Sequence, residues 1–193
     1  MSRMLELKVR YSITLIFYAL AVFYLITPGA LAEEKLERSG YWGSIYFGAG
    51  FVQRSFTGIE EDDTNFFLGF EGGYTINPHF LIGAELSGWL LESSDVNDPS
   101  EGEGISQVFL TTRLYPSTSI GLFAKVGGGY VSYWNNRPGE PSSRDGWGLT
   151  LGGGYDFPLY ESFAISPFIN YSFGEADDQD HNVWTLGIGL TFQ

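Results

Sequence analysis

The sequence contains no cysteine and two histidines, and its ten Lys and Arg residues are outnumbered by 23 Asp and Glu. Without cysteine there is no disulfide framework and no thiol chemistry. A net charge of −13 argues against nucleic-acid binding, which needs a basic surface. After residue 32 no apolar run is long enough for a spanning helix, which excludes a helical membrane protein.

The first 32 residues have the three parts of a secretory signal peptide. Arg3, Lys8 and Arg10 precede an apolar run at 11–26, and the stretch ends in Ala30-Leu31-Ala32. We expect cleavage after Ala32. An uncleaved membrane anchor is the alternative, since the apolar run is near the lower length limit of a spanning helix.

Removal of residues 1–32 leaves seven basic and 22 acidic residues, a net charge of −15, in a length that suits one domain. Residues 33–39 are charged and without periodicity, and we expect them to form a short periplasmic segment. Residues 40–193 alternate in hydropathy. Alternation hides apolar surface from a hydropathy average, so a mean hydropathy of −0.03 is compatible with a membrane barrel.

The segment 182–193 alternates between large apolar side chains and small or polar ones. One face holds Trp184, Leu186, Ile188, Leu190 and Phe192, and the other holds Val183, Thr185, Gly187, Gly189 and Thr191. A period of two predicts a strand. The second face looks too small and polar for a packed core, so we expect the apolar face to point outward into lipid. A soluble ligand-binding barrel is the alternative, but a water-facing surface would not carry so many large apolar side chains.

Seven earlier segments show the same alternation, so the sequence predicts eight strands, at 41–53, 66–76, 80–91, 105–115, 120–134, 147–157, 163–173 and 182–193. Their connections alternate between short ones, at 77–78, 116–119 and 158–161, and long ones, at 55–64, 92–104, 135–145 and 175–181. Short turns at one rim and long loops at the other are typical of outer-membrane barrels. The predicted fold is all-β, an eight-stranded antiparallel up-and-down transmembrane β-barrel.

The pattern across residues 40–193 resembles the small eight-stranded outer-membrane barrels: the OmpA transmembrane domain, OmpX, Ail and the opacity-type proteins. Thr185, Gly187, Leu190 and Phe192 match the C-terminal assembly signal of that family, although Gln193 follows the aromatic residue on which members usually end. The resemblance implies a monomer in the outer membrane of a Gram-negative bacterium, inserted by the barrel assembly machinery.

Alternation places four charged residues on the inward face: Glu71, Glu85, Arg113 and Lys125. Unpaired charges inside a barrel would be costly, so we expect acids and bases to pair. Strand tilt and shear leave the pairing open. The four residues are either a static polar core or a switchable, proton-sensitive gate, and a narrow filled lumen argues against a general porin.

Most other acids lie in the predicted long loops. Closure of the barrel places the first and last loops side by side, and they contain Glu60, Glu61, Asp62, Asp63, Asp177, Asp178 and Asp180. Such carboxylates suit Ca²⁺ or Mg²⁺, or cation bridges to lipopolysaccharide. The alternative is a solvated loop surface without a metal. We expect no cofactor.

Some barrels of this size modify lipid A, which needs a nucleophile and a histidine base within reach of each other. His79 follows a turn at the periplasmic rim. His181 is at the outer rim, but Ser172, the nearest candidate partner, points inward. We therefore expect a non-enzymatic protein that contributes to envelope integrity or binds an extracellular ligand or host surface through acidic loops. A lipid A deacylase or acyltransferase is the alternative.

Overall fold

The computed structural model describes residues 38–56, 59–91, 103–135, 143–176 and 179–193, with the backbone alone for 54–56, 59–63, 91, 176 and 179. These residues belong to one compact unit, Lys35–Gln193. The expected signal peptide, residues 1–32, and most of the expected periplasmic segment lie outside the described residues. Within the described part of the chain, no helix is long and apolar enough to cross a membrane.

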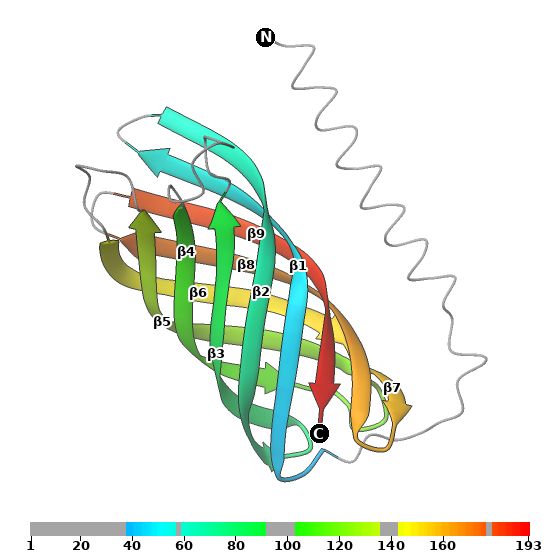
Figure 1. The fold of residues 1–193 in the computed structure, drawn as a ribbon. Coiled ribbons are helices and arrows are strands. Elements are labelled where there is room, and N and C mark those ends of the chain that lie inside the picture. Colours follow the sequence, from blue (N-terminus) through cyan, green and yellow to red (C-terminus); the bar gives the residue numbers. More distant parts are fainter. Residues whose placement is uncertain (1–37, 57–58, 92–102, 136–142, 177–178) are drawn as a thin grey trace. The chain divides into compact units, whose positions relative to one another are not determined.

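The described chain consists almost entirely of antiparallel strands (Figure 1). They are β1 (Tyr41–Phe56), β2 (Ile59–Asn77), β3 (Phe80–Leu91), β4 (Glu103–Leu114), β5 (Leu122–Asn135), β6 (Ser143–Tyr155), β7 (Phe157–Tyr160), β8 (Phe163–Ala176) and β9 (Gln179–Phe192). β6 and β7 both pair with the same side of β8 and are separated only by Asp156. They therefore act as one interrupted barrel strand, and the wall has eight strands.

The barrel closes where the last strand pairs with the first. β9 pairs with β1 from Gly43 opposite Phe192 to Phe56 opposite Gln179, and the other strands pair with their neighbours along the chain (Figure 1). Every pairing is antiparallel. This confirms the predicted eight-stranded up-and-down barrel.

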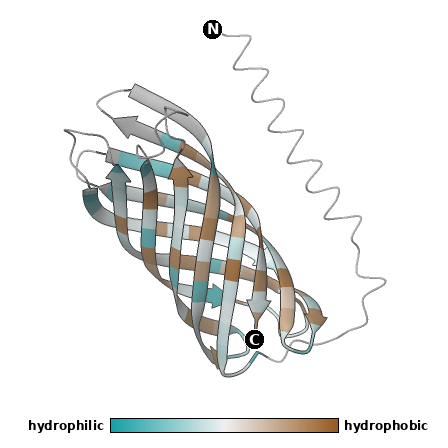
Figure 2. Cartoon of the chain, in the orientation of Figure 1, coloured by the Kyte–Doolittle hydropathy of each residue, from teal (hydrophilic) through white to brown (hydrophobic). Residues whose placement is uncertain are grey.

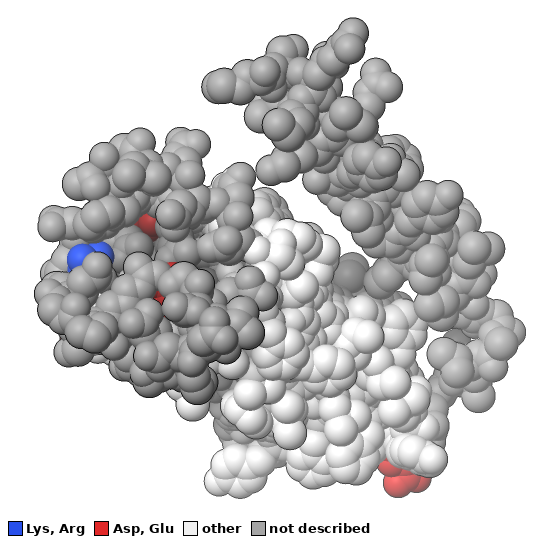
Figure 3. All heavy atoms as spheres, turned by 45° about the horizontal axis from the view of Figure 1, so that its top comes forward, with Lys and Arg blue, Asp and Glu red and all other residues white. Residues whose placement is uncertain are grey.

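Successive residues on a strand face opposite sides of the wall, and their exposure alternates accordingly. On β4, Phe109 is 1% exposed and its neighbour Leu110 is 64% exposed. Large apolar side chains cover the outer face of every barrel strand. Figure 2 shows that hydrophobic residues recur along the strands. In the view of Figure 3, the described wall between the two ends shows no charged side chain. Such a surface is unfavourable in water and suits lipid.

The longest connection, 92–102, joins β3 to β4 at one end of the barrel. At the other end, Pro78 and His79 join β2 to β3, Glu161 and Ser162 join β7 to β8, and residues 115–121 join β4 to β5. We call this the short-turn end and the opposite end the long-loop end. The predictions that 55–64 and 175–181 are long loops are wrong. β8 extends to Ala176, which pairs with Gln179 at the start of β9. β1 and β2 remain paired as far as Phe56 opposite Ile59, so Glu60 to Asp63 lie within β2.

Main-chain hydrogen bonding explains this difference. Consecutive acids are poor strand formers by propensity, but strand propensity depends strongly on context. At the long-loop end the two strands continue as a hairpin whose backbone groups pair with each other. β9 also begins earlier than predicted, at Gln179, where it pairs with both β1 and β8.

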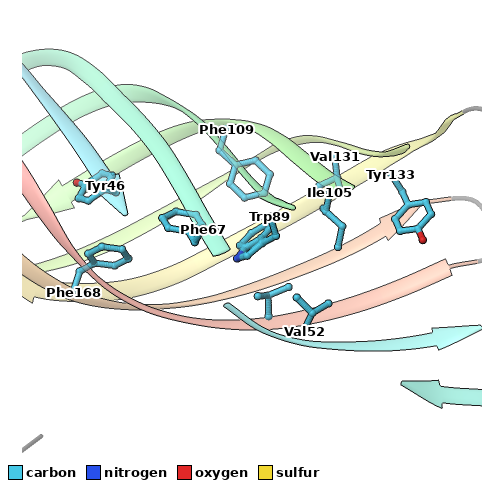
Figure 4. Packing of buried hydrophobic residues seen from close by; sticks show 10 residues of the cluster. Tyr46, Val52, Phe67, Trp89, Ile105, Phe109, Val131, Tyr133 and Phe168 are labelled. Atoms are coloured by element: carbon cyan, nitrogen blue, oxygen red, sulfur yellow. The ribbon is translucent and has the colours of Figure 1, made fainter. Parts of the chain in front are cut away.

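The interior is filled, and a large hydrophobic cluster lies toward the long-loop end (Figure 4). Ten buried residues form this aromatic and aliphatic cluster: Tyr46, Val52, Phe67, Trp89, Ile105, Phe109, Val131, Tyr133, Phe168 and Val183. The inward face of 182–193 is as small as predicted, and the core beside it is packed because rings from other strands fill the space. Inward glycines leave room for rings of other strands, as Gly50 does for Trp89 and Gly187 does for Phe168.

Candidate functional site

The interior toward the short-turn end contains a buried ion pair between β4 and β2. Arg113 donates to Oε2 of Glu71 from Nη2 at 2.5 Å and from Nε at 3.1 Å. Thr111 donates to the other carboxylate oxygen at 2.7 Å, and Tyr46 donates to Oε2 at 2.8 Å. Arg113 also donates to the hydroxyl oxygens of Tyr46 and Ser44. Several hydrogen bonds thus compensate for the removal of the Glu71 carboxylate from water.

Aromatic rings surround the Arg113 guanidinium as well. Its central carbon lies 4.2 Å from the ring centroid of Trp42 and 5.0 Å from that of Phe123. A cation over an aromatic face is attracted by the ring quadrupole, most strongly where water is excluded. Arg113 is 0% exposed, so these contacts replace part of its lost hydration.

A second buried ion pair joins β5 to β3. Lys125 Nζ lies 2.5 Å from Oε2 of Glu85, and Ser87 donates to Oε1 of Glu85 at 2.8 Å. The amide of Asn170, with its oxygen toward Lys125, accepts from Nζ at 3.0 Å. The structure thus brings together Arg113 with Glu71 and Lys125 with Glu85, the detail that the sequence left open.

Two further interior charges, Arg38 and Asp156, were missed by the sequence analysis. Asp156 is 0% exposed and accepts hydrogen bonds from Tyr115 at 2.7 Å, Ser166 at 2.7 Å and Gln193 at 3.2 Å. Asp156 directly follows β6, whose even-numbered residues face inward. Continuation of that alternation by one residue could have identified it. Among the described residues the short-turn half of the interior therefore holds three acids and three bases.

Arg38 lies inside the barrel at the short-turn end. Its guanidinium carbon is 3.7 Å from the ring centroid of Tyr115, and its Nη2 donates to the carbonyl of Ile120 at 3.0 Å. The residue is 5% exposed. The described end of the expected periplasmic segment thus occupies the barrel opening instead of lying free beside it.

The expected assembly-signal residues all lie on β9. Thr185 faces inward and is buried, Gly187 packs against the ring of Phe168, and Leu190 and Phe192 face outward. Gln193, which departs from the family pattern, is buried, and its Nε2 donates to Tyr115 and Asp156 at 3.2 Å. Recognition of these residues by the assembly machinery stays a prediction.

The expected cation-binding acids are brought together only in part. Ser55 of β1 lies between Glu60 of β2 and Asp180 of β9 in the sheet, so the first and last acidic stretches are neighbours. Glu60, Glu61, Asp62 and Asp63 are described by backbone alone, and Asp177 and Asp178 lie outside the described residues. Within the described side chains, no group of three or more His, Asp or Glu is placed to hold a metal ion.

The histidines do not lie in a catalytic arrangement. His181 is 2% exposed and points into the interior, where the amide nitrogen of Gln107 lies 3.4 Å from its Nε2. The outward side chains beside it, Asn182 and Asp180, are polar, so His181 lies beyond the lipid-facing band. Burial lowers its pKa to about 4, although the nearby Asp180 acts in the opposite direction.

His79 and Ser172 also have structural partners. Nδ1 of His79 lies 2.8 Å from the carbonyl of Tyr115 at the short-turn end. Ser172 faces inward and donates to Thr150 at 3.2 Å.

Comparison with known proteins places these features in a family. Residues 17–192 match the family model of the outer membrane protein beta-barrel domain. No curated protein is significantly similar to the chain in sequence. The fold is similar to that of Ail, the attachment invasion locus protein of Yersinia pestis, with 19% identity over 80% of this chain and 99% of Ail and a TM-score of 0.52.

Two other solved structures are similar. Ail in complex with the heparin analogue sucrose octasulfate is 18% identical over 79% of this chain and 99% of that one, with a TM-score of 0.51. Neisserial surface protein A is 15% identical over 80% and 97%, with a TM-score of 0.56. The fold and the family model lead to one conclusion: the chain belongs to the outer membrane protein beta-barrel domain family.

Proposed function

We propose that the protein is a non-enzymatic, monomeric barrel of the Gram-negative outer membrane that contributes to envelope integrity and binds extracellular ligands through an acidic surface. The filled interior is the observation that carries the proposal. Two buried ion pairs and a cluster of aromatic and aliphatic side chains occupy it. A barrel that is apolar outside and filled inside spans a membrane without forming a wide channel.

The charge at the long-loop end supports a binding surface for cations. Residues 60–63, 92–103, 140–145 and 175–180 hold fifteen of the 23 acids of the chain. The strand ends and loops on this side hold three basic residues, Arg54, Arg137 and Arg144. Carboxylate oxygens are the ligands that Ca²⁺ and Mg²⁺ prefer, and acidic surfaces also attract basic partners.

The ligand class therefore differs from that of the heparin analogue in the Ail complex. A sulfated sugar is a polyanion, and its recognition depends on basic side chains. The acids of this chain favour a cationic ligand instead. We infer that lipopolysaccharide is bound through Mg²⁺ or Ca²⁺ ions that bridge its phosphates to these carboxylates.

Charge neutralisation tests this function. In the variant E60Q/E61Q/D62N/D63N, Mg²⁺-dependent binding of purified lipopolysaccharide to the barrel in nanodiscs should weaken. Cells that carry the variant should admit more of a hydrophobic dye. The control E33Q/E34Q/E37Q removes acids from the expected periplasmic segment and should change neither result. Unchanged binding and permeability in the first variant would contradict the proposal.

The lipid A enzyme is the alternative, and the described contacts do not support it. His181 and Ser172 both face the interior, away from the lipid where lipid A lies. Mass spectrometry of lipid A from cells with and without the protein separates the two functions. We expect identical acylation, and a change that depends on His181 would favour the enzyme.

A further inference from the structure

The β1–β9 seam joins the first strand to the last, and a buried side-chain hydrogen bond crosses it on the inner face. Ser44 on β1 and Thr191 on β9 are opposite each other in the sheet. Their hydroxyl oxygens are 2.9 Å apart, and the residues are 5% and 0% exposed. At Ser44 and Thr191, a side-chain hydrogen bond thus joins β1 to β9 in addition to the main-chain hydrogen bonds.

On the β1 side, this hydrogen bond continues to the buried ion pair. Arg113 Nη2 donates to Ser44 Oγ at 2.8 Å, and the same nitrogen lies 2.5 Å from the carboxylate of Glu71. Ser44 therefore connects the seam to a guanidinium on β4 that is held by a carboxylate on β2.

On the β9 side, the connection ends at another carboxylate. Thr191 Oγ1 and Ser166 Oγ are 2.8 Å apart, and Ser166 donates to Oδ1 of Asp156 at 2.7 Å. Asp156 stands at the interruption between β6 and β7, and its other oxygen accepts from Tyr115.

The two ends of this connection fix the direction of every bond in it. A guanidinium only donates and a carboxylate only accepts. The protons therefore point from Arg113 through the three hydroxyl groups to Asp156. We call these five residues, Arg113, Ser44, Thr191, Ser166 and Asp156, the seam network. Hydrogen bonds in series polarise one another, and a buried member without a partner is costly.

We propose that the seam network is an internal latch on the β1–β9 seam, so that opening of the seam and breakage of the Arg113–Glu71 ion pair are energetically coupled. Separation of β1 from β9 breaks the network between Ser44 and Thr191. Arg113 then keeps its bond to Ser44, and Asp156 keeps its bond to Ser166. Each loses the hydrogen-bonded hydroxyl groups beyond that first partner. The same network also joins β9 to β8 through Thr191 and Ser166, and Tyr46 joins β1 to Glu71 on β2.

Amide hydrogen exchange of the full chain in bilayer nanodiscs tests the latch. In Thr191→Val, which keeps the shape and removes the hydroxyl, amides of the seam between residues 44–48 and 187–191 should exchange about tenfold faster or more, since a hydrogen bond in a charged network contributes roughly one tenfold step in the opening equilibrium. Amides of the β4–β5 pair should not change.

Ser172→Ala is the matched control. It removes a buried hydroxyl bond of 3.2 Å, to Thr150, that joins β8 to β6 outside the seam network. It should leave exchange at the β1–β9 seam unchanged. Thr191→Ser restores the hydroxyl and should restore wild-type exchange at the seam.

Coupling to the ion pair needs a double variant. Ser44→Ala and Glu71→Gln should each speed exchange at the seam, and together they should have less effect than the product of the two, because both act on Arg113.

Three results would overturn the proposal: wild-type seam exchange in Thr191→Val, equal acceleration at β4–β5, or independent effects of Ser44→Ala and Glu71→Gln. If Thr191→Val does not fold, Thr191→Ser must fold, and failure of both would show that packing of the methyl group and not the hydroxyl holds the seam.

Discussion

Glu71 on β2 lies directly opposite Glu85 on β3 in the barrel wall, yet the two carboxylates are bound by different cations. Arg113 and Lys125 are likewise directly opposite each other, on β4 and β5. Like charges opposite each other on a sheet are unfavourable. The interior ion pairs offset this repulsion, because each acid is bound by a base on the second strand along the wall.

Loss of one cation should therefore destabilise the barrel strongly. Arg113→Met leaves the Glu71 carboxylate buried without its guanidinium and should lower the free energy of unfolding by about 3–5 kcal/mol. Urea titration in lipid vesicles, followed by tryptophan fluorescence, measures this. Thr112→Val, the next residue on the outward face, is the control and should stay within about 0.5 kcal/mol. The double variant R113M/E71Q should lose less than the two single losses combined, and simple additivity would contradict the pairing.

Arg38 should hold the chain in the short-turn opening. Arg38→Ala removes the contact with the Tyr115 ring and the hydrogen bond to Ile120, at a cost of about 1–3 kcal/mol. Proteolysis of the folded protein should then cut near residue 38 more readily. Arg38→Lys keeps the charge without the planar stacking group and should give an intermediate result. Identical cleavage in all three proteins would show that Arg38 does not fix this segment.

Interior glycines should tolerate substitution less than outward ones. A Cβ on Gly50 would overlap with the indole ring of Trp89, so Gly50→Ala should destabilise by about 1–3 kcal/mol through overpacking. Gly43→Ala is the matched control on the same strand, because its nearest neighbour is the carbonyl of Glu71 at 3.6 Å. Denaturant midpoints of the two variants give the comparison, and equal midpoints would count against the close packing of Trp89.

His181 should make stability depend on pH. Its pKa is lowered from 6.5 to about 4 in the folded protein, so between these values the unfolded chain binds a proton that the folded chain does not. The folded state should lose up to roughly 3 kcal/mol as the pH falls through this window and should lose nothing above it. His181→Asn should remove that part of the slope in urea titrations between pH 4 and 7. If the stability of the variant falls with pH as steeply as that of the wild type, other groups cause the pH dependence.

The sequence predicts the fold because alternation over eight segments specifies which face of each strand meets lipid. It also identifies Glu71, Glu85, Arg113 and Lys125 as inward, because the face on which a side chain lies depends only on its odd or even position within one strand. Their partners depend on strand tilt and register, which are set by the closed sheet. Pairing therefore emerges only from the structure.

Other features were missed for different reasons. Arg38 precedes the first alternating segment, so its burial depends on the packing of a segment without periodicity. The extension of β2 through Glu60 to Asp63 is hidden by residues that are poor strand formers. The aromatic cluster is hidden because rings such as Trp89 fill space above glycines of other strands, a relation between distant positions that no local pattern reports.

A membrane-spanning barrel whose interior is filled should not conduct ions as a porin does. The most direct test is the conductance of the purified full chain in planar lipid bilayers. The filled interior predicts that the protein inserts without producing large, stable conductance steps. Large, long-lived steps from the wild-type barrel, of the kind that a water-filled porin gives, would contradict the account.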